Sequence, residues 1–489
     1  MGIFTIKERS AKSAVFWGFL ERVSSQATGF LIGIILARLL SPSDYGTMGL
    51  LTIFIAVAAT FVDAGFGSAL IRKLDRDEDD LTTAFYFNIL AGGVLFGLLC
   101  LMSPCIAAFY GEPVLVPLVC LAGLNLLFNS FCVVQRTLMA AKLDIKASAF
   151  ITLSTQLPSG VVAILMAYNG FGLYSLVAQS LVATAMGALM IWFISDWRPR
   201  GRFTRKSLGY LWGFGSKLLA ANLIGAIFNE IYSCIIGKCF RKEQLGYYTK
   251  AASLNNCVKD ASAGLVMRVT LPVMSRYQSS TEVFREKFRE IMLLMLLVVA
   301  PISAYMTFSA KEIIVLLWTD KWASSAPILQ ILLFGSLFLP ISQLSLSSFQ
   351  ALGRTDITLK LELPKKVIYC CLIACGIRHG VIGVVIAQAL AFIVGSVINL
   401  IPTKRLFNYG YIKQVLDIAK YISFAYLIAF PVSRLVAFDA VVYSVIVRLG
   451  LIIPLYLLVL LVVRDNITIK YLGIIGQYCG MNIGSREGS

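Results

Sequence analysis

Charged side chains are scarce in this sequence. Only 14% of the 489 residues are Asp, Glu, Lys or Arg, and 58% are hydrophobic, whereas charged residues make up about 25% of a typical soluble protein. The polar segments between the apolar stretches rarely exceed about fifteen residues, which is too short for a separate soluble domain. The composition therefore excludes a water-soluble enzyme and indicates a chain whose main solvent is lipid.

Groups that hold metals and nucleotides are also few. The chain has one histidine, His379, and its 11 cysteines fall mostly inside apolar stretches without the spacing of a metal site, which is typical of small buried hydrophobic residues. It contains no GxxxxGK[ST] phosphate-binding loop. We therefore expect no metal, no cofactor and no ATP hydrolysis within the chain. Because no loop is long enough to carry catalytic acids, we also expect no enzymatic activity.

Long apolar runs, by contrast, follow one another from end to end. A helix that crosses a bilayer needs about 20 mainly apolar residues, and these runs predict an all-α integral membrane protein of about fourteen transmembrane helices. We expect the spans at residues 13–38, 46–70, 82–108, 113–137, 147–168, 171–194, 209–236, 246–273, 290–308, 324–352, 357–377, 380–403, 416–437 and 440–463.

The net charge of +17 is explained by where the basic residues fall. They concentrate on alternate loops, for example at Arg72 and Lys73 and at five positions within 198–206, while the loops at 109–112 and 169–170 hold none. The main exception is an external loop that contains Lys238, Arg241 and Lys242. Because positive loops stay inside, both termini are predicted in the cytoplasm. Topology accounts for the charge, and no nucleic-acid partner is expected.

Two pairs of similar segments indicate an internal repeat. Gly46 follows Arg38 as Gly246 follows Lys238, 200 residues further on, and segment 140–145 resembles segment 352–357. Both pairs relate spans that are six crossings apart, so the two halves share one orientation and form a parallel repeat. We therefore expect two pseudo-symmetric lobes around a central cavity. The predicted divisions are an N-terminal lobe at 1–208, a C-terminal lobe at 209–404, and the last two spans with a cytoplasmic tail at 405–489.

The third span carries a GxxxG pattern. Gly93 and Gly97 lie one helical turn apart, beside Gly92, and such pairs let a neighbouring helix approach closely. The pattern predicts a helix contact at Gly93 and Gly97 and carries no information on function.

Charged and amide side chains inside the spans are the candidate functional residues. A charge at the centre of a span costs about 2.5 to 3.5 kcal/mol on insertion scales, so such residues seldom face lipid. The candidates for a cationic substrate-binding cavity are Arg22, Gln26, Lys217, Asn222, Asn256, Lys259 and Arg268. The acidic candidates for ion coupling are Glu21, Asp63, Glu230 and Asp260. They fall mostly in spans that the repeat makes equivalent, which favours one polar cavity shared by two lobes.

A structural interpretation of the same charges is also open. The charge pairs that would hold helices together are Glu21 with Arg22 and Lys259 with Asp260. Arg136 and Arg268 fit long side chains that extend to the cytoplasmic surface while their stems stay in apolar surroundings. We therefore place Arg136 at the surface rather than in the cavity.

Several segments resemble those of a known family. FWGFLER at 16–22, LARLLSPSDYG at 36–46 and FVDAGFGSALI at 61–71 are similar to the N-terminal signature of bacterial polysaccharide flippases, and DKW at 320–322 with APIL at 326–329 also fits. The resemblance covers most of the chain. It is to the Wzx-type exporters of the polysaccharide transporter family, in their colanic-acid-exporter-like branch. Multidrug and toxin extrusion proteins and the lipid II flippase belong to the same superfamily.

The resemblance implies a function that composition does not show. It implies fourteen helices in two lobes that move an undecaprenyl-diphosphate-linked oligosaccharide from the cytoplasmic to the periplasmic leaflet of the bacterial inner membrane. The product would be a surface polysaccharide such as lipopolysaccharide or exopolysaccharide. The implied partners are the lipid-linked oligosaccharide, membrane lipids, and a polysaccharide polymerase with its chain-length regulator.

Three other functions remain open on the sequence. An ion-coupled small-molecule antiporter of the same superfamily would be favoured by an acidic and aromatic cavity. A membrane polymerase or glycosyltransferase acting on the same lipid-linked sugars would need a long loop with catalytic acids, which the sequence lacks. A structural subunit without transport is disfavoured by the charges inside the spans.

Overall fold

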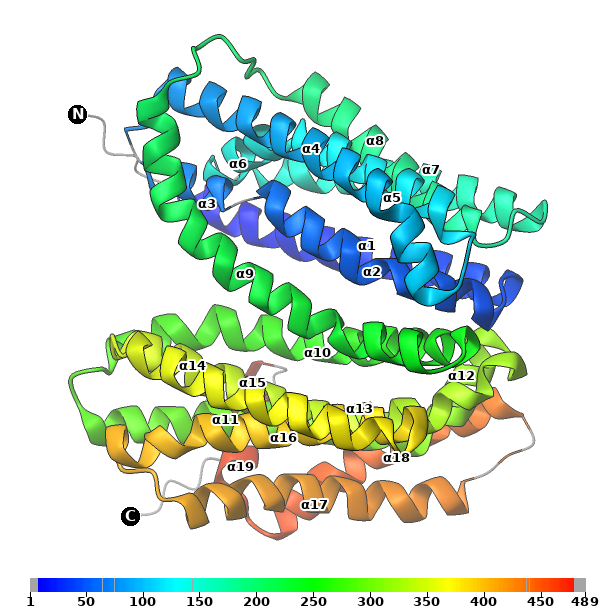
Figure 1. The fold of residues 1–489 in the computed structure, drawn as a ribbon. Coiled ribbons are helices and arrows are strands. Elements are labelled where there is room, and N and C mark those ends of the chain that lie inside the picture. Colours follow the sequence, from blue (N-terminus) through cyan, green and yellow to red (C-terminus); the bar gives the residue numbers. More distant parts are fainter. Residues whose placement is uncertain are drawn as a thin grey trace. The chain divides into compact units, whose positions relative to one another are not determined.

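The computed structural model describes residues 8–478, except residues 64, 74, 143, 437 and 439. Every regular element in this part of the chain is helical (Figure 1). Contacts between Cα atoms divide the chain into two compact units, residues 1–246 and residues 247–489. The all-α prediction is confirmed, while the predicted divisions at 208 and 404 stay predictions.

Nine helices lie within the first unit of the described chain. They are α1 (Glu8–Leu39), α2 (Pro42–Asp63), α3 (Phe66–Arg72), α4 (Glu78–Tyr110), α5 (Leu115–Ser130), α6 (Val133–Ala141), α7 (Ile145–Tyr168), α8 (Tyr174–Ile194) and α9 (Arg205–Cys239). Helix α10 (Lys242–Arg276) begins in the first unit and continues into the second.

The second unit continues with further helices. They are α11 (Thr281–Phe308), α12 (Ala310–Trp318), the 3-10 helix η1 (Asp320–Ser325), α13 (Ala326–Ser336), α14 (Leu339–Ala351), α15 (Thr355–Ile377), α16 (Gly380–Phe407), α17 (Tyr411–Leu435), α18 (Val441–Val462) and α19 (Asn466–Tyr478).

Many of these helices have the length and composition of membrane spans. In the described residues, 10 stretches qualify, and the pair α5 and α6, bent by 47°, would bring the number to 11. Three more helices, α1, α10 and α15, are 32, 35 and 23 residues long but more polar. If these three helices also cross the membrane, the total is fourteen. The predicted number of about fourteen spans therefore stays a prediction.

The order of elements repeats between the two units. In the first unit α4 packs on α5, the next helix along the chain is α6, and α7 then packs on α8. In the second unit α11 packs on α13, the next helix along the chain is α14, and α15 then packs on α16. The sequence echo marks equivalent places, because Asp144 caps α7 and Asp356 lies in the first turn of α15. The predicted two-lobe fold is thus confirmed at the level of element order.

The start of α4 is fixed by local hydrogen bonds. Asp77 accepts from the backbone N–H of Asp80 at 2.8 Å, and the side chain of Asp80 accepts from the N–H of Asp77 at 3.1 Å. This reciprocal capping satisfies two N–H groups that a helix terminus leaves open. Lys73 Nζ lies 2.5 Å from Asp80 Oδ2, which compensates the charge of a fully buried carboxylate.

The segment between α8 and α9, residues 195–204, crosses the first turns of α4. Arg202 N–H donates to Asp79 Oδ1 at 2.7 Å, and Gly201 N–H donates to Thr82 Oγ1 at 3.1 Å. A Cβ atom on Gly201 would lie 2.6 Å from the carbonyl oxygen of Glu78, so only glycine permits this approach. We call residues 195–204 the strap, because its backbone is hydrogen-bonded across another helix.

The glycine pair of the sequence echo forms a reciprocal contact. A Cβ atom on Gly46 would lie 1.8 Å from the carbonyl oxygen of Lys242, and a Cβ atom on Gly246 would lie 1.9 Å from the carbonyl oxygen of Pro42. Lys242 and Gly246 lie the same number of residues after Pro42 and Gly46. The starts of α2 and α10 therefore each contribute one glycine and one backbone carbonyl group to the contact. The start of α10 is thereby packed directly against the start of α2.

The predicted GxxxG contact is wrong. A Cβ atom on Gly93 or Gly97 would meet nothing within 4 Å among the described residues, whereas one on Gly92 would lie 2.7 Å from Ser130 Cβ. Gly92 therefore provides the close approach of α5, and the two glycines of the pattern lie on another side of α4. Spacing identified the helix but not the face that packs.

In the second unit, ion pairs connect α11, α17 and α19. Arg289 donates through Nε and Nη2 to both carboxylate oxygens of Asp417, at 2.6 and 2.7 Å. Asp465 accepts from Lys420 Nζ at 2.5 Å and from Tyr421 OH at 2.7 Å. Burial alone would raise the pKa of Asp465, but hydrogen bonds from these side chains and from the start of α19 hold it below its usual value.

Candidate functional site

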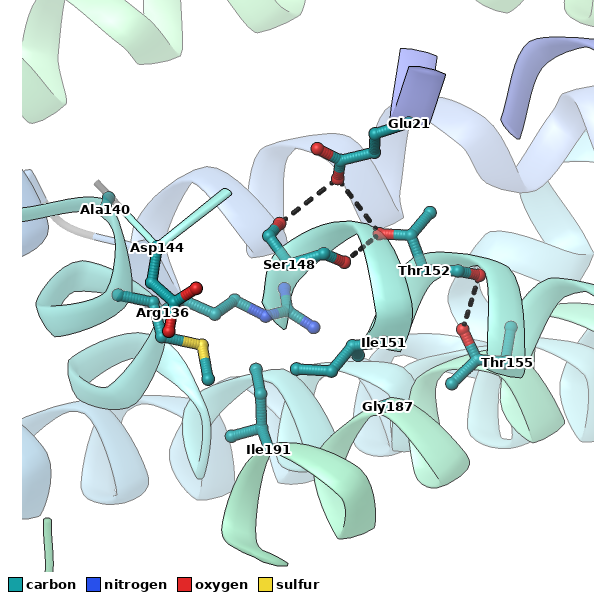
Figure 2. Close-up of a pocket in the computed structure, with 12 residues that line it drawn as sticks. Glu21, Arg136, Ala140, Asp144, Ser148, Ile151, Thr152, Thr155, Gly187 and Ile191 are labelled. Atoms are coloured by element: carbon teal, nitrogen blue, oxygen red, sulfur yellow. Dashed lines mark hydrogen bonds between the residues drawn. The ribbon is translucent and has the colours of Figure 1, made fainter. Parts of the chain in front are cut away.

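The first pocket of the N-terminal unit has a volume of about 650 Å³ and lies among α1, α6, α7 and α8. Its lining residues are Glu21, Arg136, Met139, Ala140, Asp144, Ser148, Ile151, Thr152, Thr155, Ala183, Gly187 and Ile191. Figure 2 shows Glu21 and Arg136 extending into it from different helices. A polar pocket among helices of membrane length is the setting in which functional charges occur.

Glu21 is held by two hydroxyl groups of α7. Its Oε1 accepts from Ser148 Oγ at 3.1 Å and from Thr152 Oγ1 at 3.3 Å (Figure 2). Ser148 and Thr152 are four residues apart and therefore share one face of the helix. The carboxylate thus has a defined position, with oxygen atoms of two side chains around it.

The contact between α1 and α7 fixes this position. Gln156 Nε2 donates to the carbonyl oxygen of Ser25 at 3.0 Å, one turn beyond Glu21. Further along, a Cβ atom on Gly160 would lie 2.2 Å from Ile32 Cδ1, so the two helices pack closely there. Residue numbers rise together along both helices, so α1 and α7 run parallel and present Glu21 to the first turns of α7.

A second pocket of about 460 Å³ adjoins the ends of α2 and α5. Asp63, Asn129, Arg136 and Thr137 are among its lining residues. Asp63 is the last residue of α2, and the chain turns after it through Gly65, whose φ of 70° lies in the left-handed region that favours glycine. This turn leaves the Asp63 side chain exposed at the pocket instead of inside a continuous helix.

Arg136 lines both pockets. The break between α5 and α6 bends the chain by 47° just before it, and its Nη1 donates to Asn129 Oδ1 at 3.2 Å on the other side of the break. The sequence favoured a place at the cytoplasmic surface for this side chain. The side chain is exposed and lines the two pockets, and its place relative to the membrane surface stays a prediction.

The charges of the two pockets are mixed. The first contains Glu21 and Asp144 with Arg136, and the second contains Asp63 with the same arginine. The described residues that line them include no aromatic side chain. The pockets can therefore hold an anion beside Arg136 and a proton or a small cation beside the carboxylates.

A third pocket of the same unit is apolar. Its volume is about 640 Å³, and α2, α4 and α9 line it. The lining residues are Ile53, Phe54, Val57, Ala58, Phe61, Leu95, Leu98, Leu99, Met102, Cys105, Ile106, Phe109, Ile227 and Cys234. Among these described lining residues, no side chain carries a charge, an amide or a hydroxyl group.

The other residues predicted for the site are spread over three helices. Arg22 and Gln26 are exposed on α1, Lys217 and Asn222 are exposed and Glu230 is half-buried on α9, and Asn256 and Asp260 are exposed and Lys259 is half-buried on α10. None of them lines the three pockets described above. Arg268 belongs to α10, but its side chain lies outside the described residues. Their assignment to a cavity stays a prediction.

Sequence reasoning missed the polar partners of the charged residues. Ser148 and Thr152 repeat at four-residue spacing on one face of the fifth span, and Asn129 stands seven residues before Arg136. The four-residue spacing of Ser148 and Thr152 is visible in the sequence. That both hydroxyl groups bond to Glu21 depends on how α1 packs against α7. In the described part of the chain, no three His, Cys, Asp or Glu side chains are placed to hold a metal ion.

Comparison with known sequences gives consistent matches. The sequence profile of a family described as "Polysaccharide biosynthesis protein" matches residues 35–327. The Bacillus subtilis teichuronic acid biosynthesis protein TuaB is 25% identical over 355 residues, which are 72% of this chain and 73% of the relative. The Escherichia coli lipopolysaccharide biosynthesis protein WzxC is 22% identical over 81% of both chains. The Rhizobium meliloti succinoglycan biosynthesis transport protein ExoT is 22% identical over 67% of this chain and 66% of its own.

Comparison with solved structures shows the same fold in membrane transporters. The lipid II flippase MurJ in an inward closed conformation matches with a TM-score of 0.76 at 15% identity, over 92% of this chain and 99% of its own. An inward-facing multidrug resistance transporter of the MATE family matches with a TM-score of 0.60 at 16% identity, over 78% of this chain and 95% of its own. At these identities the likeness concerns the fold alone.

Proposed function

Because the chain belongs to the family of polysaccharide biosynthesis proteins, we propose that it moves an undecaprenyl-diphosphate-linked oligosaccharide from the cytoplasmic to the periplasmic leaflet. Surface polysaccharides are built from such lipid-linked units, and a relative is named as a transport protein of succinoglycan biosynthesis. The fold shared with a lipid II flippase supports transport over synthesis. No catalytic step is part of the proposal.

The observation that carries this proposal is the pair of polar pockets that share Arg136 among helices of membrane length. A diphosphate with its sugars needs a hydrated path with cations, whereas the polyprenyl tail remains in lipid. An apolar bundle with no such pockets would give the head group nothing to bind.

The substrate path is proposed to include the basic and amide residues identified from the sequence. These are Arg22, Gln26, Lys217, Asn222, Asn256, Lys259 and Arg268. We expect reversal of Arg22 or of Lys259 to Glu to abolish export, because each would put a negative charge where the diphosphate passes. Protein level and membrane insertion are the controls, and normal export from both inserted variants would contradict this assignment.

Ion coupling is proposed for the acidic residues Glu21, Asp63, Glu230 and Asp260. Glu21 has the best structural support, because its carboxylate and two hydroxyl groups form an oxygen-rich site for a proton or a small cation. Each elementary charge that crosses a membrane potential of 100 mV releases about 2.3 kcal/mol. Such coupling would supply the driving force without ATP.

The cellular setting follows from the same proposal. The chain is a multi-span membrane protein, and we place it in the bacterial inner membrane with both termini in the cytoplasm, as the basic loops predict. A polysaccharide polymerase and its chain-length regulator are proposed partners, because they act on the unit that this protein would deliver.

A second candidate is an ion-coupled antiporter of small molecules. It is favoured by the excess of acidic over basic side chains in the first pocket, where Glu21 and Asp144 face one arginine. The two functions differ in substrate, so a deletion strain that gains sensitivity to cationic drugs while its polysaccharide stays normal would favour the antiporter.

The decisive experiment locates the lipid-linked oligosaccharide in a deletion strain. Spheroplasts would be treated with a sugar-binding probe that cannot cross the membrane, before and after permeabilisation. We expect the intermediate to accumulate on the cytoplasmic face and to reach the outer face when the wild-type gene is restored. Intermediate already outside in the deletion strain would contradict flipping and point to polymerisation or a later step.

A further inference from the structure

We propose that Arg136, together with Asn129, forms a binding site for a phosphate group on the side of the second pocket. The inference deepens the proposed function, on which it rests, by assigning the residues that hold the diphosphate of the substrate in the N-terminal unit. The ligand chemistry is that of a diphosphate group, which in the proposed substrate is esterified to the polyprenol at one end and to the sugar at the other.

The chain break positions the guanidinium. Helix α5 ends at Ser130 and α6 begins at Val133, bent by 47°. Because of the bend, a side chain from the first turn of α6 meets a side chain from the last turn of α5, and Arg136 Nη1 donates to Asn129 Oδ1 at 3.2 Å. This bond orients the guanidinium and fixes the amide, so that the Asn129 Nδ2 group remains as a donor. Both residues line the second pocket.

Within the described part of the chain Arg136 makes no ion pair, although Glu21, Asp63 and Asp144 line the pockets that it shares. No carboxylate there lies within ion-pair distance of its guanidinium, and its hydrogen bond goes to a neutral amide. By comparison, Arg289 and Arg448 in the second unit are paired with Asp417 and Glu312. An arginine among membrane helices that is not bonded to a carboxylate can bind an anionic ligand, and its planar fork matches two phosphate oxygens.

The second pocket suits an anion better than the first. Its volume of about 460 Å³ lies within the range of small-ligand sites, and Ser68 adds a hydroxyl group to the guanidinium and the amide. The first pocket holds two carboxylates, Glu21 and Asp144, which would repel a phosphate. Among the described residues that line the second pocket, the one carboxylate is Asp63 of α2, and its charge would weaken anion binding without blocking it.

Substitution of Arg136 and substitution of Asp63 should change phosphate binding in opposite directions, because the two side chains carry opposite charges. Arg136→Gln should weaken phosphate binding by about tenfold or more, because a charge-assisted pair is lost. Arg136→Lys should weaken it less, because it keeps the charge but loses the fork. Asp63→Asn should strengthen binding, because it removes a repulsive charge. Lys142→Gln is the matched control, since Lys142 is an exposed cation directly after α6 that lines neither pocket.

The test uses the full-length protein in phosphatidylcholine nanodiscs. Binding would be measured with undecaprenyl diphosphate in the bilayer and, separately, with inorganic pyrophosphate in solution. Binding of undecaprenyl diphosphate but not of pyrophosphate would show that the site recognises a lipid head group. Equal competition by pyrophosphate would show that the diphosphate group alone is recognised. Either result supports the site if binding depends on Arg136. Gel filtration establishes folding, and Arg136→Lys provides a second variant should Arg136→Gln fail to fold.

Three results would overturn the inference. The first is unchanged binding by the folded Arg136 variants, and the second is an equal loss in Lys142→Gln, which would indicate a general effect of positive charge. The third is equal, Arg136-dependent binding of phosphatidylglycerol, which would assign the site to bulk lipid. None of these depends on transport, so the spheroplast experiment tests the proposed function separately.

Discussion

The reciprocal glycine contact between α2 and α10 gives the sharpest prediction for stability. In Gly46→Ala, the new Cβ atom would lie 1.8 Å from the carbonyl oxygen of Lys242, whereas real Cβ contacts essentially never fall under 3.0 Å. The helices would have to separate by about 1.2 Å at this point, because the opposing atom belongs to the backbone and no side chain can yield. Gly246→Ala would impose the same strain through Pro42.

Overpacking of this kind typically costs about 1 to 3 kcal/mol. For a unit of this size, that cost corresponds to a melting temperature lower by roughly 5 °C. The assay is thermal unfolding of the detergent-solubilised protein, followed by loss of the monodisperse peak in fluorescence-detected gel filtration. Gly93→Ala is the matched control: its Cβ atom meets nothing within 4 Å, and alanine favours a helix over glycine, so its melting temperature should stay the same or rise.

The two glycines should also be coupled. Once Gly46→Ala has separated the helices, Gly246→Ala should cost less than it does alone, because both strains are relieved by one movement. The double variant is therefore expected to melt above the temperature that adding the two single losses gives. A Gly46→Ala protein as stable as the wild type, or a double variant with fully additive losses, would refute the reasoning.

Three further predictions concern named side chains. Glu21→Gln should fold, because an amide oxygen still accepts from the hydroxyls of α7, but it should lose any dependence of export on an ion gradient, measured with and without an uncoupler; retained dependence would exclude Glu21 from coupling. Arg289→Lys should lower the melting temperature, because one of two parallel bonds to Asp417 is lost, and an unchanged value would show that the fork contributes nothing. Since Asp465 has a lowered pKa, its pair with Lys420 stabilises the folded state above the ordinary carboxyl pKa of about 4 and is lost only as pH falls through the lowered value. Protease resistance of α19 should therefore be constant from about pH 5 to 8, and a loss near pH 6 would contradict this sign.

The fold was predictable because lipid imposes simple rules on sequence. Long apolar runs can satisfy their backbone in a bilayer only as helices, which gave the all-α architecture, and the repeated segments gave the two lobes. The echo of Gly46 at Gly246 was informative because close backbone contact leaves room only for glycine at both places. The same rule failed for Gly93 and Gly97, because a GxxxG spacing shows which positions share a face and not which face is packed.

The site was only partly predictable. Glu21 and Asp63 were identified as unusual charges, and each lines a pocket. Arg136 was placed at the cytoplasmic surface because a long side chain can extend there from apolar surroundings. Nothing in the sequence marks the break between α5 and α6, which contains neither proline nor glycine. The structure bends by 47° at this break, and Arg136, just after it, lines two pockets.

The strap has a practical consequence for topology mapping. Reporter fusions and epitope insertions are usually placed in loops between spans on the assumption that such loops are free. An insertion near Gly201 would displace the hydrogen bonds that the strap makes to the first turns of α4, so a lost signal there would report damage to that helix instead of sidedness. The turn at Gly170, where an added Cβ atom meets nothing within 4 Å, is the better place for a tag on the opposite, predicted periplasmic, side.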